Sequence, residues 1–307
     1  MAILVSIPDD VRHQKRALFR RPLLVIAGFP RTGTTTLFEN LARHPGFARG
    51  LRKELDYFRH GRKPSAVEYE SLFAEWAPGQ ICLDATPYYA LDPAIAFQVQ
   101  ALAPDARVVV LLREPAAWLF SFYAQLASCR PHAPDFATFA RGGMADTGME
   151  GMPARSFSGG LYAESVEAFE AAFGSRLLLL DYAFVKSDFL GAVRTIEAFA
   201  GALPWFGAHN VDAQFYNSSA AASQSSPLIR YLVSRQWFIR LASRLFPVRL
   251  IEHARAHLFL RPRQGAGETA MSAADAALAR SLMRDSAEFY QSLFAAGPVR
   301  QGRDGWV

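Results

Sequence analysis

The stretch from Pro22 to Leu37 constrains the fold of this chain more than any other. It begins with an apolar run over 23–27, continues with a short turn between Gly28 and Gly33, and ends in three threonines that open a helical pattern. Backbone N–H groups at a helix start and the positive end of the helix dipole attract an anion, and a glycine-bracketed loop can wrap closely around it. The stretch therefore predicts a strand, a phosphate-cradling loop and a helix.

The spacing of the two glycines also fits a nucleoside-triphosphate P-loop, but one residue of that motif is missing. Thr34 follows the second glycine, where the motif requires Lys, and the cation of the loop is Arg31 instead. A triphosphate hydrolase would also need an acidic residue at a strand end for Mg²⁺, and the best apolar runs end in Arg113 or in Asp181-Tyr182. The triphosphate alternative is weakened but stays open, as does a tight connection that binds nothing.

The composition fits one large α/β domain over 1–307, because 51% of the residues are hydrophobic and 20% are charged. The net charge of +5 suits an enzyme that gathers a highly phosphorylated small ligand. A basic cluster over 12–21 contains Phe19 but no series of aromatic residues at base-stacking spacing. We therefore expect no nucleic-acid partner.

The cysteines and the hydropathy pattern bear on compartment. Cys82 and Cys129 cannot build a disulfide framework or a zinc site of several thiolates, so we expect a reducing compartment and no metal site. The first residues lack a basic region before their short apolar run, and no segment offers about 18 uninterrupted apolar residues. The expectation is a cytoplasmic protein without a transmembrane segment.

Strand and helix patterns alternate along the chain from the opening strand to about residue 201. Continuous apolar runs are typical of strands buried on both faces of a parallel sheet. Besides the opening strand and helix, the predicted strands lie at 81–90, 107–112 and 176–182, and the predicted helices at 93–102, from 115 onward, at 159–173 and at 188–201. The alternation indicates a P-loop-like three-layer α/β fold with a central parallel sheet flanked by helices.

Two residues after the predicted strand 107–112 have side chains that suit an anion. Arg113 stands at its carboxyl end, and Ser121 lies two turns into the helix that Pro115 can start. An Arg fork and a small hydroxyl can converge on one anionic group. A structural ion pair is the alternative for Arg113. The segment 81–90 is a further candidate, because its short strand delivers Asp84, Thr86 and two tyrosines to a loop beyond its end. Ligands of α/β proteins bind at the carboxyl ends of parallel strands.

The segment 52–58 carries Glu54 and Asp56 beside aromatic residues. A carboxylate held there can be tuned as a proton acceptor, and the alternative is a surface charge paired with a basic neighbour. His44 stands next to the helix-ending Pro45, and we interpret it as a structural residue rather than a base.

Three segments fall outside the alternating pattern. Residues 130–158 are rich in Pro, Gly and Met and are predicted to be an irregular segment on the acceptor side. Residues 225–267 are predicted to form a helical lid followed by a basic loop, in which Arg261 and Arg263 can close over an anionic ligand. A surface for a homo-oligomer or for peripheral membrane contact is the alternative for the amphipathic part. A last helix is predicted over 272–294.

Four blocks in this order resemble the sulfotransferases that use 3′-phosphoadenosine 5′-phosphosulfate (PAPS), nearest to the heparan-sulfate sulfotransferases and their bacterial relatives. The blocks are Gly28-Phe-Pro-Arg-Thr-Gly-Thr-Thr-Thr-Leu37, Lys53-Glu-Leu-Asp-Tyr-Phe58, Asp84-Ala-Thr-Pro-Tyr-Tyr89 and Leu112-Arg-Glu-Pro-Ala-Ala-Trp-Leu-Phe-Ser-Phe-Tyr123. They cover about the first 125 residues, and Tyr162 with the strand at 177–182 extends the resemblance to near residue 185.

The resemblance implies roles for the candidate site residues. Glu54 matches the general base of the family, Arg31 matches its basic loop residue, and Arg113 with Ser121 matches the pair that grips the 3′-phosphate. Ala85 replaces a lysine that many members have, and Lys53 is a candidate to take over its contact. The implied cofactor-binding residues are Pro30, Arg31, Thr32, Gly33, Thr34, Thr35, Thr36, Arg113, Ser121, Tyr162, Arg261 and Arg263, and the tentative acceptor residues are Lys53, Asp84, Tyr88 and Tyr89.

The implied reaction is sulfonate transfer from PAPS to an acceptor hydroxyl, with an amine as second choice, by in-line attack and without a metal. The acceptor is a small molecule, a lipid or a carbohydrate. Two rivals stay open: a P-loop kinase or hydrolase, and a nucleotide-binding or partner-binding protein that lacks chemistry.

Overall fold

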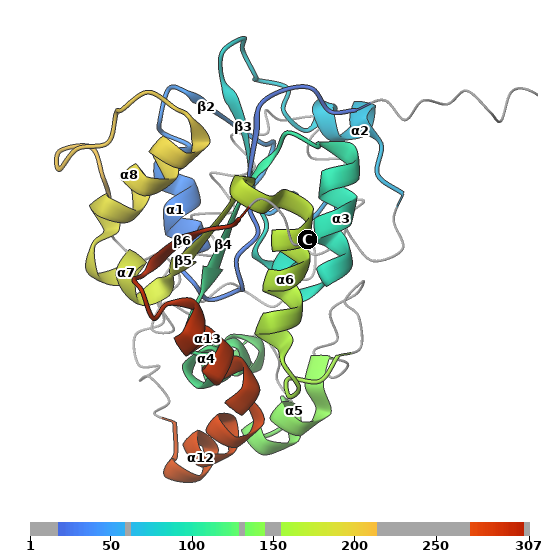
Figure 1. Cartoon of the computed structure of the whole chain (residues 1–307), viewed down its shortest axis with the longest axis vertical. Coiled ribbons are helices and arrows are strands. Elements are labelled where there is room, and N and C mark those ends of the chain that lie inside the picture. The colour runs from blue at the N-terminus through green and yellow to red at the C-terminus, as the bar shows by residue number, and fades with distance from the viewer. Residues whose placement is uncertain (1–17, 59–62, 129–132, 145–154, 214–270, 304–307) are drawn as a thin grey trace, which may run out of the picture.

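A computed structural model describes residues 18–58, 63–128, 133–144, 155–213 and 271–303. Within these ranges the centre is a six-stranded sheet in the order β2-β3-β1-β4-β5-β6 (Figure 1). The strands are β1 (Leu23–Ile26), β2 (Phe47–Arg49), β3 (Ile81–Ala85), β4 (Arg107–Leu112), β5 (Leu177–Asp181) and β6 (Val299–Gln301). Neighbouring strands from β2 to β5 run parallel, and β6 pairs with β5 in the antiparallel direction. The strand β1, which leads into the predicted phosphate-cradling loop, is therefore central.

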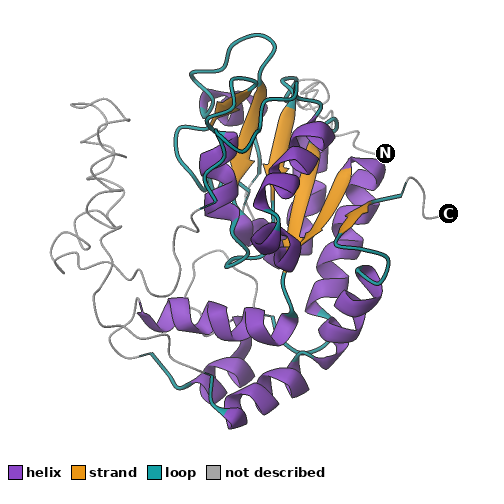
Figure 2. Ribbon diagram, turned by 90° about the vertical axis from the view of Figure 1, so that its left-hand side faces the viewer, coloured by secondary structure: helices purple, strands orange, loops and turns teal. Residues whose placement is uncertain are grey.

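Helices cover both faces of the sheet, so the predicted three-layer α/β fold is confirmed (Figures 1 and 2). The described helices are α1 (Thr34–Leu41), α2 (Ala66–Ser71), α3 (Pro93–Leu102), α4 (Pro115–Ser128), α5 (Phe136–Gly142), α6 (Leu161–Phe173), α7 (Tyr182–Ser187), α8 (Phe189–Ala200), α12 (Ala273–Leu282) and α13 (Arg284–Leu293), with two 3₁₀ turns, η2 (Pro87–Leu91) and η4 (Gly174–Arg176).

Successive residues of each strand point to opposite faces and build two separate apolar cores. In β1, Leu24 and Ile26 pack with α1, α7 and α8, whereas Leu23 and Val25 pack with α3, α4 and α6. Because both faces are buried, β1 and β4 read as continuous apolar runs rather than as alternating patterns. Helices α4, α5, α12 and α13 gather at one end of the sheet, where β4 leads into α4 (Figures 1 and 2).

Several details differ from the sequence prediction, which also lacked the short helices α2 and α7. The strand β2 was not predicted, because three residues are too short to show a pattern. The strand β6 was also missed, since its residues are exposed or partly exposed at an antiparallel sheet edge, and the sheet is therefore not wholly parallel. The segment 130–158 contains α5, which Asp135 caps by accepting the N–H of Thr138 at 2.7 Å. The predicted helix 272–294 is divided into α12 and α13 at the buried Met283.

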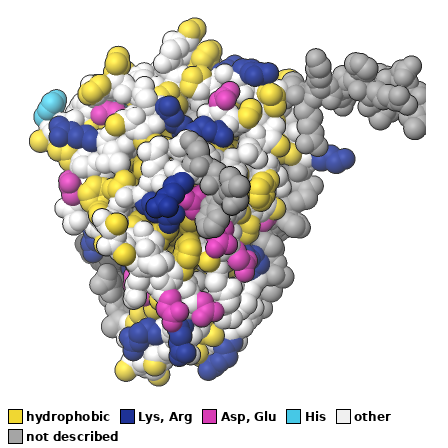
Figure 3. Space-filling view, viewed as in Figure 1, with side chains coloured by type: hydrophobic (Ala, Val, Ile, Leu, Met, Phe, Trp, Pro, Cys, Tyr) yellow, Lys and Arg dark blue, Asp and Glu magenta, His cyan; other side chains and the backbone are white. Residues whose placement is uncertain are grey.

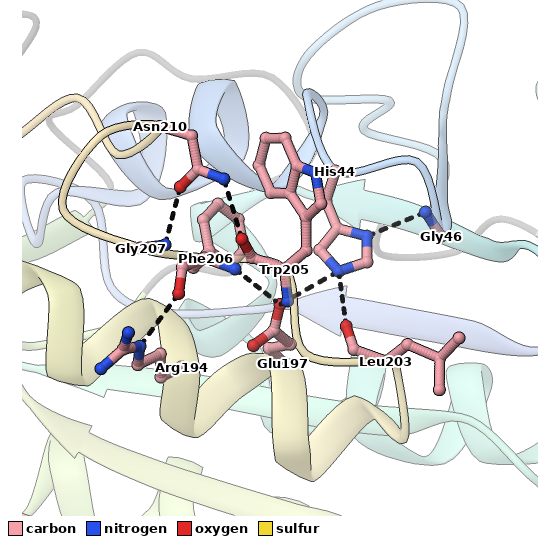
Figure 4. Close-up of polar contacts among 9 residues, drawn as sticks. All are labelled: His44, Gly46, Arg194, Glu197, Leu203, Trp205, Phe206, Gly207 and Asn210. Carbon is pink, nitrogen blue, oxygen red and sulfur yellow. Dashed lines mark hydrogen bonds and ion pairs between the residues drawn. The ribbon is translucent and has the colours of Figure 1, made fainter.

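His44 follows α1 and joins it to the segment after α8 (Figure 4). Its Nε2 lies 3.1 Å from Glu197 Oε1 and 3.0 Å from Leu203 O, and its Nδ1 accepts the N–H of Gly46 at 2.8 Å. Since Nδ1 accepts and the two neighbours of Nε2 are oxygens, the ring proton lies on Nε2. The ring is 3% exposed and contacts Trp205 edge-on, so these contacts are structural, as predicted.

The predicted lid over 225–267, with Arg261 and Arg263, lies outside the described residues. On the face shown in Figure 3, basic and acidic side chains are interspersed among apolar ones. No helix in the described part of the chain is long and apolar enough to cross a membrane.

Candidate active site

The phosphate loop (residues 28–33) leaves the sheet between two neighbouring strands. Pairing with β4 continues beyond β1, because Phe29 N–H donates to Leu111 O at 3.1 Å. A Cβ on Gly28 would lie 2.8 Å from the backbone N of Leu111, so only glycine fits this approach of the two backbones. The loop then turns at Arg31 and Gly33, with φ values of 68° and 81°. Gly33 is the N-cap of α1 and supplies no side-chain cap to its first turn.

Aromatic side chains from two helices hold the phosphate loop in place. Trp118 of α4 donates its indole N–H to Pro30 O at 3.0 Å. The ring of Phe29 packs edge-on against Trp118, with 5.4 Å between ring centroids, and in a tilted arrangement against Tyr162 of α6, with 4.4 Å between ring centroids. In the sequence Trp118 has the pattern of an apolar helix residue, and the one signal of this role is its position three residues before Ser121. Trp118 lies on the first turn of the helix that carries Ser121.

Arg31, Arg113 and Ser121 come from three different elements and meet at this loop. The Nε–H of Arg31 donates to Ser121 Oγ at 3.4 Å, and Nη1–H of Arg113 donates to the backbone oxygen of Arg31 at 3.4 Å. The guanidinium of Arg113 lies 5.1 Å from the ring centre of Tyr182. Two cations and a hydroxyl thus meet at the loop that leads into α1, which is an arrangement suited to a ligand with several anionic groups.

Tyr162, which was predicted among the cofactor-binding residues, is buried and contacts the backbone of this cluster instead of facing solvent. Its side chain is 0% exposed, and its hydroxyl donates to the backbone oxygen of Arg113 at 2.9 Å. Burial raises the pKa of Tyr162 well above its ordinary value, so the phenol stays neutral and remains a donor. The residue therefore fixes the backbone from which Arg113 projects.

The second loop (residues 50–58) follows β2 and carries Glu54. Lys53 Nζ forms an ion pair with Glu54 Oε1, and the side chains of the two residues are 18% and 40% exposed. Leu55, Tyr57 and Phe58 are buried and anchor the loop. The carboxylate of Glu54 is thus accessible and has a cation beside it, while its backbone is fixed by buried neighbours.

Backbone strain coincides with the two loops. Among the described residues, the non-glycine residues with positive φ are Arg31, Glu54 and Asp56, with φ values of 68°, 58° and 51°. Such conformations are uncommon and persist only where the surrounding structure fixes them. Their concentration here is an independent indication of a functional site.

Asp84 and Tyr89 do not lie where the acceptor prediction placed them. The two side chains are 0% and 1% exposed, and their oxygens bond to one another at 3.1 Å. The prediction that these two side chains contact the acceptor is therefore wrong, because protein atoms enclose both groups. Lys53 and Tyr88 are partly exposed and stay candidates. Ala85 is fully buried in the core beside α1, so a replacement for the family lysine has to come from another position.

A cavity of about 530 Å³ lies alongside α4, the helix that carries Ser121. Part of it comes from α5, within the segment predicted to lie on the acceptor side. The lining residues are Phe120, Tyr123, Ala124, Ala127, Ser128, Asp135, Phe136, Ala137 and Asp275. Aromatic rings and two carboxylates thus line it, and no lysine or arginine is among these residues.

The fold and the loops define an α/β protein in which two arginines and a serine hydroxyl meet beyond the carboxyl ends of its central strands. The same fold occurs in a sulfotransferase from Alicyclobacillus acidocaldarius, which is 21% identical, with a TM-score of 0.54 and coverage of 78% of this chain and 98% of that chain. A family model described as the sulfotransferase domain matches residues 21–236. The chain belongs to this family, whose members are PAPS-dependent sulfotransferases.

Sequence relatives support the assignment to the sulfotransferase family. Human heparan sulfate glucosamine 3-O-sulfotransferase 6 is 30% identical over 184 residues, which are 59% of this chain and 53% of that protein. Mouse bifunctional heparan sulfate N-deacetylase/N-sulfotransferase 4 is 23% identical over 218 residues, which are 64% of this chain and 25% of that protein. The chain thus spans about half the length of the first relative and a quarter of the second. The family assignment decides against the kinase or hydrolase alternative.

Proposed function

We propose that this protein transfers the sulfonate group of PAPS to an acceptor hydroxyl. The observation that carries the proposal is the convergence of Arg31, Arg113 and Ser121 at the start of α1. An adenosine 3′-phosphate 5′-phosphosulfate has two anionic ends, and this site offers two kinds of anion contact: a helix start with its loop, and an Arg–Ser pair.

In this proposal the phosphate loop and the start of α1 bind the 5′-phosphosulfate, through Pro30 to Thr36. Arg113 and Ser121 hold the 3′-phosphate, and Tyr162 keeps the backbone of Arg113 in place. Arg31 stabilises the charge that develops on the bridging oxygen as the bond to sulfur breaks. Arg31 also contacts Ser121, so residues proposed for the two ends of the ligand touch each other.

Glu54 is the proposed general base. A neutral hydroxyl is a poor nucleophile, so a positioned carboxylate that accepts its proton during attack speeds transfer. The acceptor oxygen forms the new bond to sulfur, the bond from sulfur to the phosphate oxygen breaks, and adenosine 3′,5′-bisphosphate leaves with that electron pair. Lys53, which is paired with Glu54, can stabilise the sulfonate oxygens in place of the lysine that Ala85 replaces.

From the cavity beside α4 we infer a small acceptor with an apolar part rather than an anionic polysaccharide. The cavity beside α4 is lined by aromatic rings, alanines, a serine and two carboxylates, which would repel sulfate or carboxylate groups. The named relatives are heparan sulfate enzymes, so a carbohydrate is the acceptor against which this inference is tested.

The test is transfer of labelled sulfonate from PAPS to a panel of acceptors: a naphthol, a sterol, an aryl amine and desulfated heparan sulfate. Glu54→Gln should abolish most turnover and keep the affinity for adenosine 3′,5′-bisphosphate. The matched control is Glu167→Gln, which makes the same change at an exposed position of α6. Normal turnover in Glu54→Gln would remove Glu54 as the base, and bisphosphate binding without transfer to any acceptor would favour a protein that lacks chemistry.

A further inference from the structure

The carboxylate of Asp84 lies at the centre of a buried network of hydroxyl groups. Asp84 stands near the carboxyl end of β3 and is 0% exposed. Its Oδ2 accepts from the hydroxyls of Tyr69 at 2.9 Å and Tyr89 at 3.1 Å, and its Oδ1 accepts from the hydroxyl of Thr86 at 2.8 Å. A carboxylate is costly to bury unless donors satisfy it, and three hydroxyls from two segments do so here.

Two of these hydroxyls also bind the backbone of the second loop. The oxygen of Tyr89 accepts the N–H of Tyr57 at 2.9 Å, and the oxygen of Thr86 accepts the N–H of Asp56 at 3.3 Å. A hydroxyl has one hydrogen and two lone pairs, so a hydroxyl that donates to Asp84 presents lone pairs in its other directions. The carboxylate therefore fixes both hydroxyls in the direction that lets them accept from the loop.

The bonded part of the loop is also the strained part. Glu54 and Asp56 have φ values of 58° and 51°, in the left-handed region that non-glycine residues rarely adopt. The bonds from Thr86 and Tyr89 reach the loop at Asp56 and at the residue after it. They hold the strained backbone two residues beyond Glu54.

We propose that Asp84 is a positioning residue: its buried carboxylate orients the hydroxyls of Thr86 and Tyr89, which hold the second loop so that Glu54 points at the reacting hydroxyl. The role of Glu54 rests on the proposed function, whereas the effect on the loop backbone does not. Asp84 itself touches neither the cofactor nor the acceptor in this arrangement.

Tyr69→Phe and Tyr89→Phe make a matched pair for the test. Each removes one buried hydroxyl that donates to the same carboxylate oxygen, but only the Tyr89 hydroxyl accepts from the loop. In the bisphosphate complex of the full chain, hydrogen exchange at the amide of Tyr57 should become about tenfold faster in Tyr89→Phe and stay unchanged in Tyr69→Phe. Equal exchange rates in the two variants would overturn the proposal.

Turnover gives a second measurement, with the acceptor that the panel identifies. Tyr89→Phe should lower kcat about tenfold while bisphosphate affinity stays unchanged, and Tyr69→Phe should keep most of kcat. Asp84→Asn should lower kcat by about the same factor as Tyr89→Phe, because an amide offers one acceptor oxygen where the carboxylate offers two. A loss of bisphosphate affinity in parallel with kcat would indicate general damage and overturn the positioning role.

The two proposals can fail separately. If Glu54→Gln keeps full turnover, the assignment of Glu54 as the base fails. The difference in hydrogen exchange between the tyrosine variants still decides whether the network holds the second loop.

Discussion

The buried carboxylate of Asp84 gives this protein a defined dependence of stability on pH. Burial raises the pKa of Asp84 from its ordinary value of 3.8 to about 6, although the hydroxyls of Thr86, Tyr69 and Tyr89 favour the ionised form. One pKa unit corresponds to about 1.4 kcal/mol, so the difference corresponds to about 3 kcal/mol. The sign follows from proton binding: between pH 3.8 and about 6 the folded state holds this proton more often than the unfolded state does. The contribution of Asp84 to the free energy of unfolding therefore falls as pH rises through this window, and is lowest above about pH 6.

The assay is urea unfolding of the wild type and of Asp84→Asn from pH 4 to pH 8, where the difference between the two proteins cancels most other titrating groups. The asparagine cannot titrate, so wild-type stability relative to the variant should fall by about 2–2.5 kcal/mol from pH 4 to pH 8, because part of the full difference is already lost at pH 4. Intrinsic damage by the amide shifts the whole difference curve but adds no slope. A difference that stays flat with pH, or that grows in favour of the wild type as pH rises, would refute the reasoning.

Three further changes test the phosphate loop. Gly28→Ala places a Cβ 2.8 Å from the backbone N of Leu111 and should lower the free energy of unfolding by about 1–3 kcal/mol, measured by urea unfolding. Unchanged stability would mean that the two strands can separate there at no cost. Arg113→Ala removes a charged donor whose hydrogen bond contributes about 1.5–3 kcal/mol. The variant should bind the bisphosphate at least about tenfold more weakly, as measured by calorimetry. Full affinity would mean that the 3′-phosphate binds elsewhere. Trp118→Phe loses the 3.0 Å bond to Pro30 O and should cost about 1 kcal/mol of bisphosphate binding, with little effect expected on the acceptor KM.

The elements that sequence predicted well are those in which local chemistry and burial agree. The run from Leu23 to Ile26 is apolar because both faces of β1 are covered, and β4 is apolar for the same reason. The phosphate loop is recognisable in the sequence by its two glycines. Gly28 is needed for the close approach of two backbones, and Gly33 has a positive φ. Arg113 and Ser121 were predictable as a pair because strand end and helix start fix their spacing, and the structure brings both to Arg31.

The elements that sequence missed depend on distant partners. The three residues of β2 become a strand because Phe47 to Arg49 pair with β3, and the exposed β6 becomes a strand because it pairs with β5 from more than a hundred residues away. Likewise, an acidic residue at the end of a strand looks the same in sequence whether it faces a ligand or a hydroxyl network. The prediction for Asp84 failed at that point, because its three donors come from Tyr69, Thr86 and Tyr89 around it.

The residues with positive φ combine a feature that the sequence predicted with one that it missed. Glycine would adopt positive φ at Arg31 or Glu54 more easily, so a side chain kept at such a position is one that the site uses or that its surroundings enforce. At Arg31 the backbone oxygen is held by Arg113 and the side chain contacts Ser121, and the loop beyond Glu54 is held by the hydroxyls around Asp84. Arg31 and Asp56 are thus each hydrogen-bonded to a segment that is distant in the sequence. The sequence showed the residues that carry charge into the site, whereas the fold shows which neutral and buried groups hold those charges in position.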